Sequence, residues 1–280
     1  MVFNRVPLWL MLSWLLLLWP NLLLAKPALR IVSLAPHATE IAYAAGLGAQ
    51  LVAVSDYSDC PAEARQLPKV ANYQSINLEK IIALQPDLII AWPAGNPAKP
   101  LEKLAQLGFN IYYSQTEQLE QIANNIEQLS QYASDPSPGI EAAKQFRTRL
   151  AQLKQRYRHA EPVRYFYQLS EQPIITLAQG KWPSEIFQFC GGVNVFASSA
   201  APYPQVGIEQ VLRQNPEVIF SASHLARQDS RWHDWPQQLQ AVANQHIWSL
   251  NSDWLNRPTP RSLLAIEQVC KYFDLVRKNH

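Results

Sequence analysis

Short apolar runs alternate with amphipathic segments along most of the chain, beginning at Leu29. Buried strands separated by helices at this spacing are typical of βαβ units on a mostly parallel sheet. In the first half the pattern predicts strands and helices in turn, with strands at 29–34, 51–54, 88–92 and 111–113 and helices at 39–45, 78–84 and 100–107. We therefore expect an α/β lobe in this half.

The second half repeats the scheme, with strands predicted at 163–168, 217–220 and 247–250. Between the halves, apolar residues recur at spacings of three and four, which predicts one helix of about twenty residues with an apolar stripe. The fold class expected is α/β, with two Rossmann-like lobes joined by a single long helix and a ligand cleft between them. The expected divisions are a lobe at 26–134, the linking helix at 135–160 and a lobe at 161–280.

An internal repeat aligns residues 73–90 with residues 203–220 without a gap. Each copy has an aromatic residue, a loop, a glutamate at the start of a helix (Glu79 and Glu209), a proline-acid turn and a buried strand. A glutamate in a first helical turn can simply stabilise the helix dipole, by about 0.3 to 1 kcal/mol. Two matched carboxylates on two lobes favour a second interpretation, docking on a partner that itself has two-fold symmetry.

Aromatic residues are numerous enough, with nine Trp, eleven Tyr and nine Phe, that many must belong to the core. Five of them lie at predicted strand ends or in loops beside Pro, Asp or Gly, namely Tyr57, Tyr73, Trp92, Trp182 and Tyr203. Strand ends on one edge of a parallel sheet are where ligands bind. If both lobes turn such edges toward each other, these rings suit a large, rigid, partly apolar ligand.

The first twenty-five residues have the layout of a signal peptide, with one positive charge at Arg5, an apolar run at 8–19 and Ala25 before a polar start. A retained membrane anchor is the alternative, but the run is shorter than the roughly twenty residues of a spanning helix. We expect export to the periplasm and a soluble mature protein. Its net charge falls from +2 to +1 with the loss of Arg5, so no surface for nucleic acid is indicated.

Export would place the three cysteines in an oxidising compartment, where a disulfide persists. Cys190 and Cys270 both fall in the second half, each at the end of an apolar helical pattern, and we predict that they pair. Cys60 lies in a turn-like stretch before Pro61 and is expected to remain free.

Sequence motifs of catalysis are missing: there is no Gly-x-Ser-x-Gly, no Walker loop and no His-Glu-x-x-His. The six histidines are scattered, and no two share a metal-ligand spacing on one helix, so neither a catalytic nor a metal site is expected. His37 and His224 are the weaker candidates for contact with a bound metal chelate. A secreted α/β enzyme is the alternative from another class, and Asp253 with Arg257 is the candidate titratable pair for it.

Sequence stretches spread over nearly the whole mature chain carry a resemblance to a known family. They are Ile31–Pro36 with Thr39 and Glu40, Tyr57–Asp59, Asn77–Glu79, Pro86–Trp92, Cys190–Gly192, Pro204–Val206, and Ser252–Trp254 with Pro260 and Arg261. On these residues the chain resembles the class III periplasmic binding proteins that serve ABC importers of metal chelates. The Tyr-Ser-Asp, Ala-Trp, Cys-Gly-Gly and Ser-Asp-Trp segments are similar to the cobalamin-binding branch.

The resemblance implies a protein that is monomeric when free, uses no cofactor and carries cobalamin to an inner-membrane permease dimer with its ATPase subunits. By position, it implies ligand contacts for Tyr57, Tyr73, Trp92, Tyr203 and Asp253, and contacts with permease arginines for Glu79 and Glu209. Tyr73 and Tyr203 stand where familiar members have tryptophan, and the loop around Ile175 lacks an expected aromatic. A haem or ferric-siderophore ligand is therefore the alternative within the family.

Overall fold

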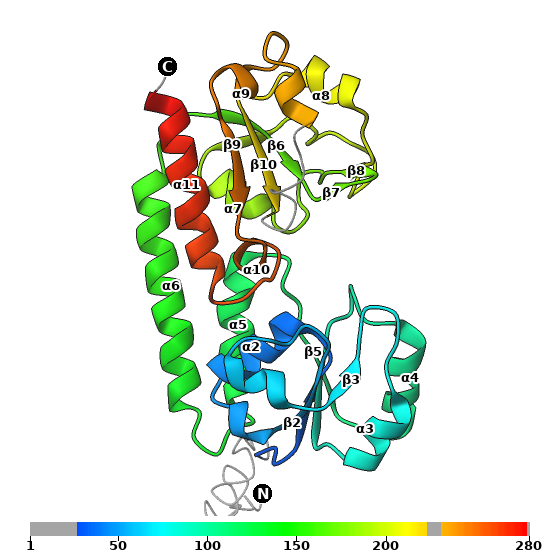
Figure 1. Ribbon diagram of the computed structural model, residues 1–280. Helices are drawn as coiled ribbons and strands as arrows, with labels where there is room; N and C mark the ends of the chain where they lie inside the picture. The colour runs from blue at the N-terminus through cyan, green and yellow to red at the C-terminus, as the bar shows by residue number, and fades with distance from the viewer. Residues whose placement is uncertain (1–26, 223–230, 279–280) are drawn as a thin grey trace, which may run out of the picture.

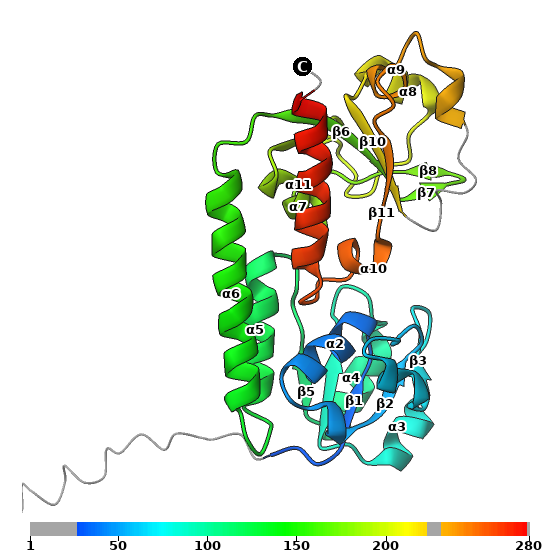
Figure 2. The ribbon, with the colours of Figure 1, turned by 60° about the vertical axis from the view of Figure 1, so that its left-hand side comes forward.

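The computed structural model describes residues 27–222 and 231–278, and in it two α/β lobes lie one above the other, with one long helix running along both (Figures 1 and 2). The proposed leader, 1–25, and His224 lie outside the described residues. Within the described ranges, no helix combines the length and the apolar character needed to cross a membrane.

The N-terminal lobe is built on a five-stranded parallel sheet with the order β3-β2-β1-β4-β5. Its strands are β1 (Ile31–Ser33), β2 (Leu51–Ser55), β3 (Lys69–Ala71), β4 (Leu88–Ala91) and β5 (Ile111–Tyr113). Its helices are α2 (Pro36–Ala44), α3 (Leu78–Leu84), α4 (Ala98–Gln106) and α5 (Leu119–Ser130), with short 3-10 turns η2 (Gly48–Gln50) and η3 (Ala62–Gln66).

The C-terminal lobe has a four-stranded parallel sheet with the order β11-β10-β6-β9 and a small antiparallel pair, β7 with β8. Its strands are β6 (Val163–Gln168), β7 (Ser170–Glu171), β8 (Ile174–Ile175), β9 (Gly192–Asn194), β10 (Val218–Ala222) and β11 (Ile247–Leu250). Its helices are α7 (Ser184–Phe189), α8 (Ile208–Gln214), η4 (Arg231–Asp234), α9 (Gln240–Ala243), α10 (Ser252–Leu255) and α11 (Ser262–Lys278).

The long helix predicted between the lobes is α6 (Ser137–Tyr157), and its stripe residues Phe146, Leu150 and Leu153 are buried. It does not stand alone, because α5 of the first lobe and α11 of the second pack against it. Helix α5 was not predicted, although Leu119, Ile122, Ala123, Ile126 and Leu129 give it a buried stripe with helical spacing. One hydrophobic core therefore continues through both lobes along these helices.

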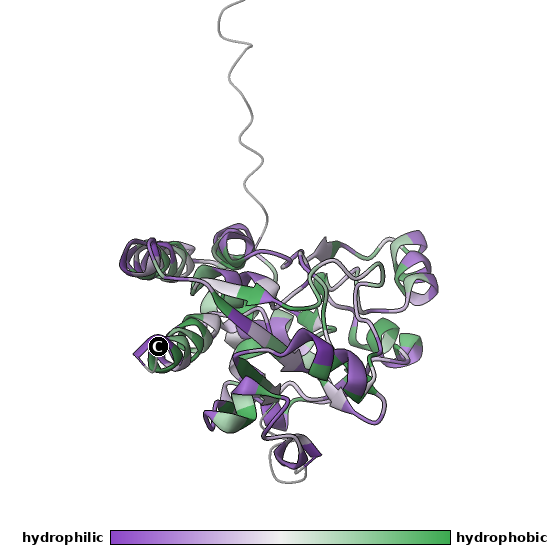
Figure 3. Cartoon of the chain, turned by 90° about the horizontal axis from the view of Figure 1, so that it is seen from above, coloured by the Kyte–Doolittle hydropathy of each residue, from purple (hydrophilic) through white to green (hydrophobic). Residues whose placement is uncertain are grey.

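Seen from above, several helices carry hydrophilic and hydrophobic residues on different sides (Figure 3). Two further apolar clusters lie elsewhere, one in each lobe.

The helix predicted at 39–45 in fact begins at Pro36. Proline is favoured in a first helical turn because its fixed φ suits the helix, and the N–H that it lacks would have no partner there.

The internal repeat is also a repeat of structure. Helices α3 and α8 both have seven residues and both end in a left-handed residue, Gln85 with φ 45° and Asn215 with φ 43°. Each is followed by a buried central strand, β4 or β10, which pairs with the first strand of its own lobe, β1 or β6. The matched sequences therefore occupy equivalent places in the two lobes.

Matched polar contacts fix these places. In the first lobe, Asp87 accepts the backbone N–H of Arg30, whose side chain donates to the carbonyl oxygen at the end of α3. In the second lobe, Glu217 accepts the backbone N–H of Arg164, whose side chain donates to the carbonyl oxygen at the end of α8. In each lobe an acid and an arginine thus tie the end of the helix to the neighbouring strand.

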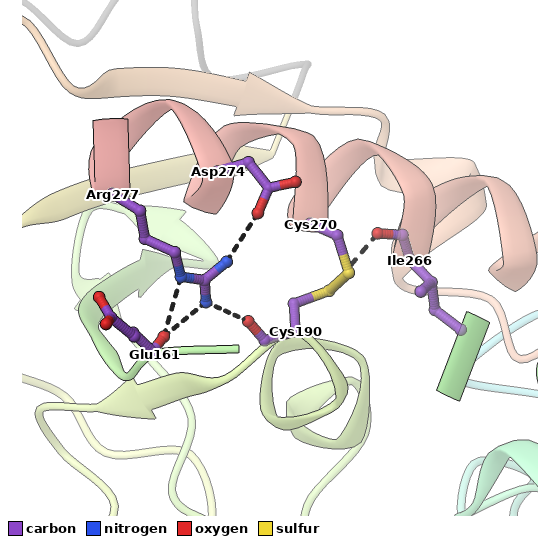
Figure 4. Close-up of a disulfide and its surroundings, with 6 residues drawn as sticks. All are labelled: Glu161, Cys190, Ile266, Cys270, Asp274 and Arg277. Atoms are coloured by element: carbon purple, nitrogen blue, oxygen red, sulfur yellow. Dashed lines mark hydrogen bonds and ion pairs between the residues drawn. A yellow bond between two sulfur atoms is a disulfide. The ribbon is translucent and has the colours of Figure 1, made fainter. Parts of the chain in front are cut away.

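The predicted disulfide between Cys190 and Cys270 is confirmed, and Cys60 is free (Figure 4). The apolar pattern that Cys270 closes in the sequence belongs to α11, which continues to Lys278. That extra length carries Arg277, whose guanidinium donates to the carbonyl oxygens of Glu161 and Cys190 (Figure 4). The disulfide and this arginine together tie α11 to the turn before β9.

Candidate functional site: the cavity between the lobes

A cavity of about 530 Å³ lies between the two lobes. The first lobe contributes Pro36, His37, Trp92, Ala94, Thr116 and Glu117, and the second contributes Leu169, Gly180–Pro183, Pro202, Tyr203 and Asn256–Pro258. Many of these residues follow the carboxyl ends of β1, β4, β5, β6 and β11. The carboxyl edges of the two parallel sheets therefore both border the cavity, which is where α/β folds bind ligands.

A smaller hollow of about 100 Å³ adjoins the cavity on the first lobe and shares Pro36 and Trp92 with it. Tyr57 and Tyr73 line this hollow, and their side chains are 74% and 77% exposed. The structure thus gathers Tyr57, Tyr73 and Trp92 around one corner of the first lobe. Large aromatic faces left open to solvent beside a cavity are available for stacking on a ligand.

Trp92 is held in place by the loop that follows β4. Its backbone N–H donates to Asn96, whose side-chain amide donates to the carbonyl oxygen of Leu34. Gly95 lies directly against the ring, since a Cβ built there would be 2.0 Å from Cε3 of Trp92. The ring position therefore depends on glycine at this place.

The second lobe contributes Trp182 and Tyr203 to the cavity. The indole N–H of Trp182 donates to the carbonyl oxygen of Leu255, which ties the loop before α7 to α10. Burial and the nearby charge of Glu117 raise the pKa of Tyr203, so this phenol stays protonated and can donate a hydrogen bond. All five predicted aromatics therefore border these cavities. Trp182 and Tyr203 line the larger one, Tyr57 and Tyr73 line the smaller one, and Trp92 lines both.

Five charged side chains join the lobes beside the cavity, and among them Arg257 lines it. Arg261 binds both carboxylate oxygens of Glu40, a buried residue of α2. Arg257 binds Asp59 of the first lobe and Asp253 of its own, the latter at 3.1 Å, and lies 3.7 Å from Glu40. We call these five residues the interlobe ion cluster. It is larger than the Asp253–Arg257 pair that the sequence indicates.

Arg257 lines the cavity, whereas Asp253 and Arg261 are not among the lining residues. Burial opposes ionisation of Asp59, but the hydrogen bond and charge of Arg257 outweigh it and hold the pKa of Asp59 below its ordinary value. Burial likewise opposes the charge of Arg261, yet the bond to Glu40 prevails and raises its pKa. Both ends of the cluster therefore stay charged. Asp253 does not line the cavity, so it would act on a bound ligand through its ion-pair partner Arg257.

A second contact between the lobes involves Glu185 of α7. Its carboxylate accepts the backbone N–H of Leu119 at 2.6 Å, at the first residue of α5. Burial raises the pKa of Glu185. A carboxylate at a helix N-terminus stabilises the helix, so this residue connects the second lobe to the helix that packs beside α6.

Glu79 and Glu209 are each the second residue of a short helix, α3 or α8, and both are exposed. Neither lines the cavity. Their equivalent positions in the two lobes follow from the repeat, while their role in docking stays a prediction. Within the part of the chain that the structure describes, no group of three or more His, Cys, Asp or Glu residues is arranged to hold a metal ion.

The two parallel sheets, the bridging helix α6 and the cavity between the sheet edges define a two-lobed ligand-binding protein. The family model described as "Periplasmic binding protein" matches residues 31–253. Since this is more than half of the chain, the chain belongs to the periplasmic binding protein family, whose members bind substrates for transport.

Known relatives include proteins of very similar sequence. The chain is 64% identical over 253 residues to a vitamin B12-binding protein of Vibrio parahaemolyticus, covering 90% of this chain and 92% of the relative. A crystal structure of the periplasmic vitamin B12 binding protein BtuF of Vibrio cholerae is similar with a TM-score of 0.88 and 61% identity, covering 90% of this chain and 99% of that one. The periplasmic haem-binding protein RhuT of Roseiflexus has a TM-score of 0.77 at 20% identity, over 90% and 99% of the two chains, which shows a shared fold alone.

Proposed function

We propose that this chain binds cobalamin in the cavity between its lobes and delivers it to the inner-membrane permease of an ABC importer. The observation that carries the proposal is the high identity to vitamin B12-binding proteins over about nine tenths of the chain. The open aromatic rings beside the cavity support it, because a corrin is large, rigid and partly apolar. The proposal gives the chain no catalytic step and no resident cofactor.

In this proposal, residues 1–25 are a signal peptide and the mature protein works in the periplasm as a monomer, with lobes at 26–134 and 161–280 joined by 135–160. The disulfide between Cys190 and Cys270 supports an oxidising compartment, since such bonds rarely persist in the cytosol. Membership of the periplasmic binding protein family supports the same location.

The ligand contacts proposed are Tyr57, Tyr73 and Trp92 on the first lobe and Trp182, Tyr203 and Asp253 on the second. The support for the aromatics is their place at the two hollows. Asp253 is supported more weakly, through its ion pair with the cavity residue Arg257. Glu79 and Glu209 are proposed to bind the permease dimer with its ATPase subunits, because they are exposed and equivalent in the two lobes.

The test is calorimetric titration of the purified mature protein with cyanocobalamin and, separately, with haemin. We expect saturable binding of one cyanocobalamin per chain and no comparable binding of haemin. Trp92→Ala should weaken cyanocobalamin binding by about 1 to 3 kcal/mol, as when a well-packed aromatic anchor is lost. Absence of cyanocobalamin binding to the unaltered protein would refute the ligand assignment and leave the family assignment standing.

A further inference from the structure

Two buried polar side chains of the cavity wall lack hydrogen-bond partners among the described residues. They are His37, through Nε2, and Thr116, through its hydroxyl. Both residues line the cavity and are only 4% exposed. The two unpaired polar atoms are themselves buried, so each side chain must turn toward the cavity to contact a ligand. Buried polar groups are nearly always paired, and an unpaired one destabilises the fold, so each such group calls for an explanation.

The two residues come from different elements and flank Trp92. His37 is the second residue of α2, after β1, and Thr116 follows β5, while Trp92 follows β4, which lies between β1 and β5 in the sheet. The imidazole of His37 contacts the Trp92 ring edge-on, with ring centroids 5.1 Å apart and planes at 87°. The wall beside the aromatic anchor is therefore polar on both sides.

The hydrogen-bonding capacity of this wall is neutral. Burial, assisted by the charge of Arg257, lowers the pKa of His37 to about 3, so the ring is uncharged at periplasmic pH. A neutral imidazole has one donor and one acceptor nitrogen, and a threonine hydroxyl can do both. Such a pair matches a group that also donates and accepts, and a primary carboxamide is such a group.

The charges around the cavity disfavour an anionic ligand group. Among the described residues that line it, the Lys and Arg side chains are Lys181 and Arg257. Arg257 is already paired with Asp59 and Asp253 and lies near Glu40. Lys181 is exposed, and Glu117 also lines the cavity. A ligand carboxylate would therefore lose its hydration without gaining an unengaged buried cation.

We infer that His37 and Thr116 bind carboxamide groups at the periphery of the ligand, and that the cavity discriminates against ligands that carry carboxylates in their place. The inference rests on the proposed function, because cobalamin supplies the carboxamides. It adds a chemical basis for the choice of ligand. The aromatic rings hold the flat surface of the ligand, and the neutral polar wall distinguishes ligands with carboxamide side groups from those with carboxylates.

Single substitutions test the contacts. Thr116→Val keeps the shape of the side chain and removes the hydroxyl, and it should weaken cyanocobalamin binding about 3- to 10-fold, the worth of one hydrogen bond. His37→Ala should weaken it by a similar or larger factor. Ser114→Ala is the matched control, because the Ser114 hydroxyl is also buried and unpaired, two residues before Thr116, but does not line the cavity. It should leave the affinity unchanged.

A modified ligand tests the discrimination. Mild acid converts single propionamide side chains of cyanocobalamin to carboxylates, and calorimetry compares these monocarboxylic acids with the parent amide. The unaltered protein should bind at least one of the isomers about 10-fold more weakly or worse, since an unpaired charge is harder to bury than an amide. Asp59→Asn removes one carboxylate partner of Arg257 and so leaves this arginine freer to pair with a ligand carboxylate. The ratio of the dissociation constant of the monocarboxylic acid to that of the parent amide should therefore become smaller. The ratio cancels any general effect of the substitution on folding.

The outcomes separate this inference from the proposed function. If the unaltered protein binds no cyanocobalamin, the proposed function is refuted and this inference falls with it. If it binds cyanocobalamin, but Thr116→Val and His37→Ala bind as tightly as Ser114→Ala, the two residues are not ligand contacts. If all the monocarboxylic acids bind as tightly as the amide, the discrimination is refuted while the proposed function stands.

Discussion

The guanidinium of Arg261 forms two hydrogen bonds with the carboxylate of Glu40, a residue 221 positions earlier in the chain and in the other lobe. The Glu40 side chain is only 5% exposed and that of Arg261 is 24% exposed. Together with Arg257 and its two partners, this pair fixes the C-terminal segment before α11 against α2. The geometry at the cavity therefore depends on a buried ionic contact as well as on the helix α6.

Breaking this pair from one side should be strongly destabilising. Glu40→Gln leaves a largely buried arginine without its charge partner, and we expect the free energy of unfolding to fall by about 3 kcal/mol. Replacing both partners by apolar residues, as in Glu40→Leu with Arg261→Met, should cost less than the single change. Chemical denaturation of the three proteins measures this.

The matched control is the ion pair between Arg149 and Glu267, whose side chains are 50% and 41% exposed. Glu267→Gln should change stability by less than about 1 kcal/mol, because exposed pairs contribute little. Equal effects of Glu40→Gln and Glu267→Gln would show that burial adds nothing to the contact between the lobes.

Much of the fold could be predicted because it depends on local patterns. The apolar runs of β5, β6 and β11 were placed at their observed bounds, and the spacing of Phe146, Leu150 and Leu153 predicted α6. Helix α5 has a similar stripe, so residues 119–130 carry the same local signal as α6. The repeat placed Glu79 and Glu209 at equivalent positions without any structure.

The ion cluster could not be predicted in the same way. Glu40 lies in an apolar helix, and no local spacing relates it to Arg261, so their contact is a property of the folded chain alone. The unpaired atoms of His37 and Thr116 are likewise visible only when every neighbour is in place. Glu40 is the one acidic residue of α2 and stands beside the apolar Ile41 and Ala42, which is the signal in the sequence that a buried partner exists.

Gly95→Ala should weaken ligand binding by displacing the Trp92 ring. The added methyl group would lie 2.0 Å from the Trp92 ring, so the indole must move away from its position at the two hollows. We expect a loss of about 1 to 3 kcal/mol in cyanocobalamin affinity, close to that of Trp92→Ala. Calorimetry gives the affinity, and tryptophan fluorescence reports the displaced ring.

Gly48→Ala is the control for this change. A Cβ at Gly48 would meet the ring of Tyr43 at 2.3 Å, a similar collision, but Tyr43 lines neither hollow. Its effect should be confined to stability. Equal losses of affinity in the two variants would mean that general distortion, and not the position of Trp92, governs binding.

His37 should make the fold less stable as the pH falls. Its pKa is lowered to about 3 in the folded protein, mainly by burial, against about 6.5 in an unfolded chain. Between these values the unfolded state takes up a proton that the folded state does not, so the free energy of unfolding decreases as the pH falls through this window. From pH 7 to pH 5, His37 alone should contribute a loss of about 2 kcal/mol.

Urea unfolding of the unaltered protein and of His37→Gln, each at pH 7 and pH 5, measures this contribution. All other titrating groups are common to the two proteins, so the difference between their pH dependences isolates the imidazole. The variant should lose less stability on acidification. Parallel pH dependences would mean that His37 takes up its proton over the same pH range in the folded and unfolded states, so that burial does not lower its pKa.

Glu79 and Glu209 should serve the transporter and not the ligand. They are exposed, lie at equivalent positions in α3 and α8, and do not line the cavity. A permease dimer offers the same site twice, so one carboxylate from each lobe can bind each subunit, whereas an asymmetric ligand gains nothing from matched acids. Reversing both charges places like charges together at the contact, which costs several kcal/mol.

The double variant Glu79→Arg with Glu209→Arg should therefore abolish cobalamin uptake by cells while cyanocobalamin affinity in solution stays unchanged. Glu141→Arg, an exposed charge reversal on α6, controls for the change in net charge and should support normal uptake. Each single reversal should give an intermediate loss, because one subunit contact remains. If the double variant takes up cobalamin at the normal rate, these glutamates only stabilise their helix N-termini. If it loses ligand affinity, they belong to the binding site instead.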